Sequence, residues 1–189
     1  MKILVFAGSA RSASLNKRLA AEAYRLLGEA GVEATLIDLR DYDMPIYDGD
    51  LEAASGSPEN ARKLRTLFSQ HEGLLIVTPE NNSSLPSLLK NTIDWISRSE
   101  GGVSGGVYFK GKIAAIMAAS PGGLGGLRVL FHLRQVLNGL GMLVIPEQFA
   151  LAQADKAFDK DGRLQDVRHV DAVRAVVARL SEVCRRMSA

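Results

Sequence analysis

The chain has 189 residues, which fits one domain, and 47% of them are apolar while 23% are charged, a balance that excludes an intrinsically disordered chain. The 23 lysines and arginines exceed the 21 aspartates and glutamates by only +2, too little to indicate a nucleic-acid or membrane partner by charge. The single cysteine, Cys184, excludes an intramolecular disulfide and a cysteine-ligated zinc site, and His71, His132 and His169 are too widely spaced for a helical metal-binding pair.

The first part of the chain reads as two strands separated by a helix. Residues 2–7 (KILVFA) are a nearly continuous apolar run, typical of a strand buried on both faces of a parallel sheet. Apolar residues recur at helical spacing over residues 15–27, and Gly31 stands where a helix C-cap glycine belongs. A second apolar run predicts a strand at residues 34–39, and residues 41–58 are expected to form the longest surface loop.

The rest of the chain repeats this alternation. Ser57 followed by Pro58 predicts the capped start of a helix that runs to about residue 70. Pro86 opens the next predicted helix, which runs to about residue 98. The remaining predicted elements are strands at residues 73–78, 112–119 and 142–145, a helix at about residues 124–139, and a final helix at about residues 166–187.

Strands that alternate with helices of this length predict a parallel α/β sheet. Five strands in a single domain over residues 1–189 favour a flavodoxin-like three-layer sandwich with strand order 2-1-3-4-5. In such sheets, ligands bind beyond the carboxyl ends of the strands where the strand order reverses, here between the first and third strands. The segments expected to form a site are therefore residues 8–16, 79–87 and 120–126.

The first of these segments has the composition of an anion pocket. Residues 8–16 (GSARSASLN) join a buried strand to a helix N-terminus and carry hydroxyl groups, an amide and the Arg11 guanidinium. Free backbone amides and the helix dipole favour a phosphate monoester there. The alternative is that Ser12 or Ser14 only caps the helix while Gly8 makes the turn. No G-x-G-x-x-G dinucleotide fingerprint occurs, so a mononucleotide is the preferred ligand.

Three motifs at the ends of these strands resemble those of a known family. They are Gly8-Ser9-x-Arg11 with Ser14 and Asn16, then Thr78-Pro79-Glu80-Asn81-Asn82 followed by Ser84-x-Pro86 and Asp94-Trp95, and finally Ser120-Pro121-Gly122. Together they resemble the NADPH-dependent FMN reductase family, of the flavodoxin-like quinone or chromate reductase type. Asn81 departs from the family pattern, which usually has a tyrosine there, and Ser87 replaces a glycine.

The resemblance implies a site for FMN and no metal or catalytic side chain. The first loop would hold the phosphate of FMN, and the segment after the third strand would lie along the isoalloxazine ring, with Ser120 in the similar position on the third loop. Glu80 is assigned to binding, because hydride transfer from nicotinamide to flavin needs no general base. The residues expected to bind FMN are Ser9, Arg11, Ser14, Asn16, Pro79, Glu80, Asn81, Asn82 and Ser120.

The activity implied is an NAD(P)H-dependent reductase, in which NADPH or NADH gives a hydride to bound FMN and a small oxidant then takes the electrons. That oxidant would be a quinone, an azo or nitro compound, chromate or free flavin. One alternative is a flavodoxin-like electron carrier, although such carriers usually present an acidic docking face and this chain has a charge of +2. Another is an interaction module without cofactor, which the replacement at Asn81 leaves open.

Three further expectations concern burial and assembly. Cys184 lies on the apolar stripe of the last helix and is expected to be a buried structural thiol, whereas His132 is expected to be a surface or packing residue. The helix from Pro86 carries Leu88, Leu89, Ile93, Trp95 and Ile96, more apolar surface than one face against a sheet requires, which predicts a homodimer or homotetramer. Whether Trp95 faces a partner or the core stays open.

The location of the protein follows from its hydropathy. No apolar run approaches the roughly 18 residues needed to cross a bilayer. Met1 leads directly into the first predicted strand without the layout of a signal peptide. We therefore expect a cytoplasmic protein with no membrane partner and no nucleic-acid partner.

Overall fold

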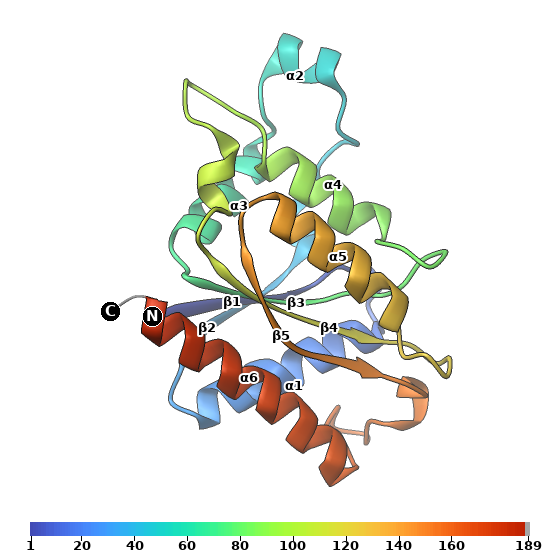
Figure 1. Ribbon diagram of the computed structural model, residues 1–189. Helices are drawn as coiled ribbons and strands as arrows, with labels where there is room; N and C mark the ends of the chain where they lie inside the picture. The colour runs from blue at the N-terminus through green and yellow to red at the C-terminus, as the bar shows by residue number, and fades with distance from the viewer. Residues whose placement is uncertain (188–189) are drawn as a thin grey trace.

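A computed structural model describes residues 1–187 and shows a parallel sheet between two layers of helices (Figure 1). The five strands are hydrogen-bonded in the order β2-β1-β3-β4-β5, and every neighbouring pair is parallel. The expected flavodoxin-like α/β sandwich and its strand order are thus confirmed. The strands are β1 (Lys2–Ala7), β2 (Glu33–Asp38), β3 (Gly73–Val77), β4 (Ile113–Ala119) and β5 (Leu143–Leu151).

The helices divide between the two faces of the sheet. In Figure 1, α1 (Leu15–Glu29) and α6 (Val167–Met187) lie below the sheet, and the other long helices lie above it. The upper layer consists of α3 (Glu59–Ser69), α4 (Ser87–Ile96) and α5 (Leu127–Gly139). Short elements complete the described chain: α2 (Gly49–Ser55) and the 3-10 turns η1 (Leu39–Tyr42), η2 (Gly105–Tyr108) and η3 (Ala154–Lys156).

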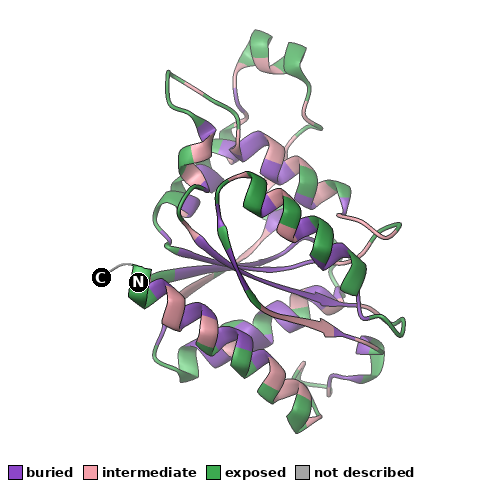
Figure 2. Cartoon of the chain, viewed as in Figure 1, coloured by how far each residue is buried: buried purple, intermediate pink, exposed green. Residues whose placement is uncertain are grey.

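The central strands are buried on both faces, which explains why their sequences read as unbroken apolar runs (Figure 2). Within β1, Ile3 and Val5 pack with α1 and α6, whereas Leu4 and Phe6 pack with the opposite helix layer. Cys184 is fully buried in the first of these two cores. Its burial raises the pKa of its thiol to about 11, so the expectation of a structural cysteine is confirmed.

The expected loop at residues 41–58 is not wholly irregular. It contains α2, whose residues are all at least partly exposed, and it extends away from the sheet at the top of Figure 1. The start of this excursion folds back over α4: the indole Nε1 of Trp95 donates a hydrogen bond of 2.7 Å to the Pro45 carbonyl, and the Tyr47 ring packs edge-on at 5.0 Å.

This contact corrects the expectation that α4 has apolar surface left over for a partner subunit. Trp95, Leu89 and Ile96 have no exposed surface, and Ile93 is 4% exposed. These four side chains of α4 are therefore covered within the chain itself, by the sheet on one side and by the Pro45–Tyr47 region on the other, whereas Leu88 is half-buried. The question left open for Trp95 is settled in favour of the core.

Three element boundaries differ from the expectation for local reasons. The first residue of α3 is Glu59, and its N-cap residue is Pro58 without a side-chain cap, so the predicted Ser57 cap is wrong. The glycines at 125 and 126 adopt φ of 62° and 85°, which delays α5 to Leu127. β5 continues to Leu151 because a register shift opposite Ala114 and Ile116 accommodates Pro146, which lacks an N–H group.

Among residues 1–187, no helix combines the length and hydrophobicity that crossing a membrane requires.

Candidate functional site

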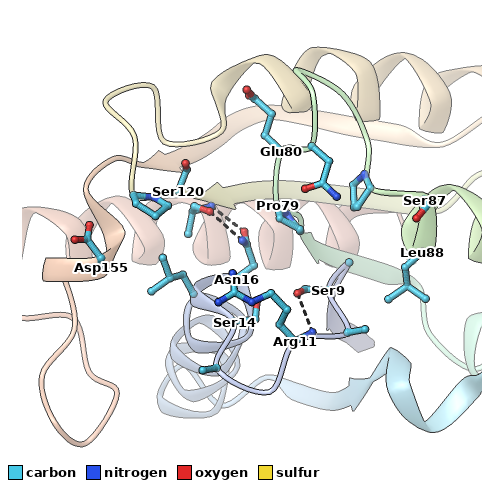
Figure 3. A pocket seen from close by; sticks show the side chains of 18 residues that line it. Ser9, Arg11, Ser14, Asn16, Pro79, Glu80, Ser87, Leu88, Ser120 and Asp155 are labelled. Carbon is cyan, nitrogen blue, oxygen red and sulfur yellow. Dashed lines mark hydrogen bonds between the residues drawn. The ribbon is translucent and has the colours of Figure 1, made fainter.

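A cavity of about 600 Å³ opens at the carboxyl ends of β1, β3 and β4, where the strand order reverses (Figure 3). All three loops singled out in the sequence contribute to its wall. Of the nine residues expected to bind a cofactor, Asn82 alone is not part of the lining. The structure thus brings together Ser9, Arg11, Ser14, Asn16, Pro79, Glu80, Asn81 and Ser120.

The loop after β1 presents hydrogen-bond donors and positive charge to the cavity. The Ser14 Oγ caps α1 by accepting a hydrogen bond of 3.4 Å from the Lys17 amide, and the Ser9 Oγ accepts one of 3.4 Å from the Arg11 amide. The Arg11 side chain is exposed at the rim and bonds to no side chain or carbonyl of residues 1–187. The first turn of α1 holds no acidic residue. An anion at this place would meet an unpaired guanidinium and a helix N-terminus.

Asn16 has a structural role within the site. Its Nδ2 donates a hydrogen bond of 2.9 Å to the Ala119 carbonyl, and its Oδ1 accepts one of 2.8 Å from the Ala119 amide (Figure 3). The side chain is 3% exposed. This double hydrogen bond ties the first turn of α1 to the end of β4, so Asn16 fixes the spacing of two cavity walls. A contact between Asn16 and a phosphate stays a prediction.

Glu80 connects the loop after β3 to α5. Its carboxylate accepts hydrogen bonds of 3.1 Å from the Arg128 amide and 3.3 Å from the Val129 amide, and it forms an ion pair with the Arg128 guanidinium. Because the N-cap residue of α5, Gly126, offers no side chain, Glu80 caps the helix from a different loop. Burial of the carboxyl acts to raise its pKa, but the hydrogen bonds from Arg128 and Val129 and the charge of Arg128 outweigh it, so the pKa is lowered.

A tight turn follows Glu80. Asn81 and Ser84 exchange two backbone hydrogen bonds of 3.0 Å each, and the two residues between them, Asn82 and Ser83, have φ of 49° and 65°. Asn82 is exposed on this turn, which explains why it does not line the cavity. The Ser84 Oγ lies 2.8 Å from Nδ1 of His132 on α5, and the two share a hydrogen bond.

The loop after β4 completes the wall. The Ser120 Oγ accepts a hydrogen bond of 3.2 Å from the Gly122 amide, and the Ser120 backbone bonds to Leu151 and Ala154. Gly125 passes so close to the backbone after β5 that a Cβ atom there would lie 2.7 Å from the Ala152 nitrogen, so only glycine fits.

Two residues of the site region were missed in the sequence. Asp155 lines the cavity from η3 (Figure 3), and His132 contacts the loop from α5. The sequence around each gives no signal, because both reach the site through packing of segments far away in the chain. Among residues 1–187, no group of three or more histidine, cysteine, aspartate or glutamate side chains is arranged to hold a metal ion.

Comparison with known proteins points to one family. The model of the NADPH-dependent FMN reductase family matches residues 1–156. The chain is 34% identical over 188 residues to the NAD(P)H-dependent FMN reductase PA1204 of Pseudomonas aeruginosa, a match that covers 99% of this chain and 97% of that protein. It is 30% identical over 189 residues to a quinone reductase of Escherichia coli, with coverage of 99% and 97%.

A solved structure of a flavoenzyme is also similar to this chain. The flavoenzyme NAD(P)H:(acceptor) oxidoreductase FerB from Paracoccus denitrificans superposes with a TM-score of 0.81 at 28% sequence identity. The match covers 98% of both chains. The two folds are therefore similar over nearly the whole length of both chains.

Proposed function

The chain belongs to the NADPH-dependent FMN reductase family as an NAD(P)H-dependent enzyme that uses FMN, and we propose that FMN lies in the cavity at the ends of β1, β3 and β4. Bound FMN would supply the redox chemistry, which is hydride acceptance from NADPH or NADH and electron transfer to a small oxidant such as a quinone, an azo or nitro compound, chromate or free flavin. The residues of this chain supply binding and orientation.

The observation that carries the proposal is the anion site after β1. Arg11 is unpaired among the described residues, the capped N-terminus of α1 lies beside it, and both belong to one cavity. A phosphate monoester would take a charge-assisted hydrogen bond from Arg11 and favourable interactions with the helix dipole. The donor set therefore fits the phosphate of FMN.

The rest of the cavity suits a flat ring. Pro79 and Asn81 form one wall after β3, and Ser120 and Pro121 form the other after β4. Backbone amides and apolar surfaces in this arrangement can orient the polar and apolar edges of a flavin. Glu80 is held by Arg128 and the start of α5, so we assign it to fixing the wall instead of to proton transfer. Rate enhancement then comes from positioning.

We also propose that the protein is a homodimer or homotetramer. Because four of the five apolar residues of α4 are buried, the support comes from α5. Leu124 just before this helix, Leu127 and Phe131 are 54%, 37% and 60% exposed. Leu127 and Phe131 lie four residues apart, the spacing of one helix face, and Leu124 precedes them on the loop that leads into the helix. A second copy of the chain on this face would cover them beside the entrance to the cavity.

The purified protein tests the proposed function directly. We expect a yellow protein that releases FMN on denaturation, or a colourless one that takes up added FMN. Anaerobic addition of NADPH should bleach the bound flavin with no other protein present, and a quinone should restore the colour. A protein that does not bind FMN would support the cofactor-free module, and a flavin that NADPH reduces only with an added reductase would support an electron carrier.

A further inference from the structure

The first two turns of α5 hold the loop after β3 at two points. Arg128 binds Glu80 at the beginning of this loop, and His132, one turn further along the helix, binds Ser84 at its end. Arg128 and His132 are four residues apart, so they project from the same face of α5. The segment between the two attachment points, residues 80–84, includes Asn81 on the cavity wall.

The turn between these points has a backbone conformation that costs free energy. Asn82 and Ser83 both have left-handed φ values, 49° and 65°, and neither is a glycine. Residues with a Cβ atom adopt this region at a cost in free energy, and two-residue turns of this kind prefer glycine. Such a turn persists where its surroundings over-determine it. Here the two backbone hydrogen bonds between Asn81 and Ser84 close the turn, and the contacts of Glu80 and Ser84 with α5 attach both of its ends to the helix.

We propose that Ser84 and His132 are positioning residues of the flavin site, which keep the Asn81–Ser84 turn closed and thereby hold Asn81 in place on the cavity wall. The inference rests on the proposed function of the cavity. Neither Ser84 nor His132 lines the cavity, so they act through the turn and are not catalytic residues. The phosphate site around Arg11 is on a different loop and does not depend on them.

Because the phosphate site and the Asn81–Ser84 turn are on different loops, loss of the Ser84–His132 hydrogen bond should affect some properties and not others. The Ser84–His132 hydrogen bond is exposed, so its removal should change overall stability little. The turn should open more often, and the geometry of the ring wall should become less well defined. FMN should stay anchored by its phosphate, whereas the rate at which nicotinamide reduces the flavin should fall, because hydride transfer depends on orientation.

The experiment uses a double-mutant cycle of Ser84→Ala, His132→Ala and the combined variant. His132→Asn is the conservative variant, since its amide can offer a hydrogen-bonding atom near the position of Nδ1. Gln135→Ala is the matched control, at an exposed residue on the same helix whose side chain makes no hydrogen bond or ion pair with the described residues. Three quantities are measured: amide hydrogen exchange at Asn81 and Ser84 without FMN, the Kd for FMN, and the single-turnover rate of flavin reduction by NADPH.

We expect each alanine variant to raise exchange at Asn81 and Ser84 and to slow flavin reduction by about 3- to 10-fold, the effect of one neutral hydrogen bond. The Kd for FMN should change less than about 2-fold, the double variant should equal the single variants, and His132→Asn should recover most of the loss. Additive effects, no recovery, or rates equal to those of Gln135→Ala would overturn the inference.

The readouts separate this inference from the proposed function. If FMN does not bind, or NADPH does not reduce it, in the unmodified protein, then the proposed function fails, and the positioning role fails with it even if the exchange data show that the pair closes the turn. If the unmodified protein is reduced normally while exchange and reduction are the same in all variants, the proposed function stands and the role of Ser84 and His132 is wrong.

Discussion

Arg11 shows most directly how one side chain can define the ligand. Its guanidinium lies at the cavity rim, and no described group pairs with it. We expect Arg11→Ala to weaken FMN binding by roughly 1.5 to 3 kcal/mol, because a charge-assisted hydrogen bond to the phosphate is lost while the amides at the start of α1 remain. Titration of the apoprotein with FMN measures this. The control of equal charge is Arg18→Ala, at an exposed arginine near the start of α1.

Unchanged affinity in Arg11→Ala would place the phosphate elsewhere and remove the assignment of the first loop. A loss of equal size in Arg18→Ala would show that only the general positive charge matters. The two variants therefore distinguish a specific contact from electrostatic attraction over longer range.

Glu80 gives a prediction with a defined pH dependence. Its pKa is lowered in the folded protein, so its carboxylate stabilises the fold above the ordinary pKa of glutamate, and this contribution is lost as the pH falls through the folded-state pKa. We expect Glu80→Gln to reduce the free energy of unfolding by about 1 to 2 kcal/mol at pH 7, the scale of a lost helix cap.

Urea unfolding of the two proteins at several pH values checks this expectation. The difference between wild type and Glu80→Gln should shrink as the pH falls through the lowered folded-state pKa of Glu80, because the wild-type carboxyl then becomes protonated. Asp171→Asn, which removes an exposed carboxylate paired with Arg174, should cost well under about 1 kcal/mol. A constant difference across the pH range would mean that the charge of Glu80 does not stabilise α5.

The same residues show what a sequence reveals at this scale. Ser9, Arg11 and Ser14 were predictable because a polar loop between a buried strand and a helix is a local pattern. The roles of Glu80 and His132 were not, since their partners lie 48 residues away in the chain. When a carboxylate caps a helix that lies elsewhere in the chain, the sequence around the carboxylate gives no signal of that role. Only the packing of α5 beside the loop after β3 brings the groups together.

At the scale of elements, the N-terminus of α1 is the feature with a testable consequence. It carries a side-chain cap and no acidic residue in its first turn, and its residues Leu15 and Asn16 line the cavity. We expect FMN to bind at least about 100-fold more tightly than riboflavin, because the phosphate is the group that this helix end and Arg11 recognise. Parallel titrations of the apoprotein with both flavins give the ratio.

Equal Kd values for the two flavins would contradict the phosphate site while leaving the ring site untouched. The Arg11→Ala variant provides the control, since it should weaken FMN binding and leave riboflavin binding nearly unchanged. This contrast ties the element and the side chain to the same chemical group.

Elements with a strong hydrophobic period were predictable, and those without one were not. The first strand was predicted at its observed bounds, and the central strands came within one residue of theirs. The short helix α2 was missed because it contains no fully buried residue and therefore no apolar stripe. β5 was predicted too short because Pro146 interrupts its apolar run, although a register shift lets the strand continue.

The strand order of the whole molecule was predictable because right-handed crossovers and short connections leave few arrangements for five parallel strands. The cavity could be located from that order alone, since it lies where the strand order reverses, between β1 and β3. The surface available for assembly could not be predicted from the sequence. The covering of Trp95 by Pro45 and Tyr47 depends on a loop whose path no periodicity defines.

The proposed assembly therefore has to be tested on α5. We expect sedimentation at micromolar concentration to show no monomer. Phe131→Glu should shift the protein to smaller species, because Phe131 is 60% exposed on the face that a second copy would cover, and a charge there would be buried without a partner. The matched control is Val167→Glu on α6, equally apolar and 68% exposed but in the opposite helix layer.

The outcome also decides whether assembly matters for the site. Phe131 is adjacent to His132, so loss of the interface should slow the reduction of FMN by NADPH in proportion to the fraction of dissociated protein. Dilution of the unmodified protein should have the same effect, with the rate recovering on concentration. A stable wild-type monomer with full NADPH-dependent activity would show that one chain closes its own site, and the exposed face of α5 would then need a different occupant.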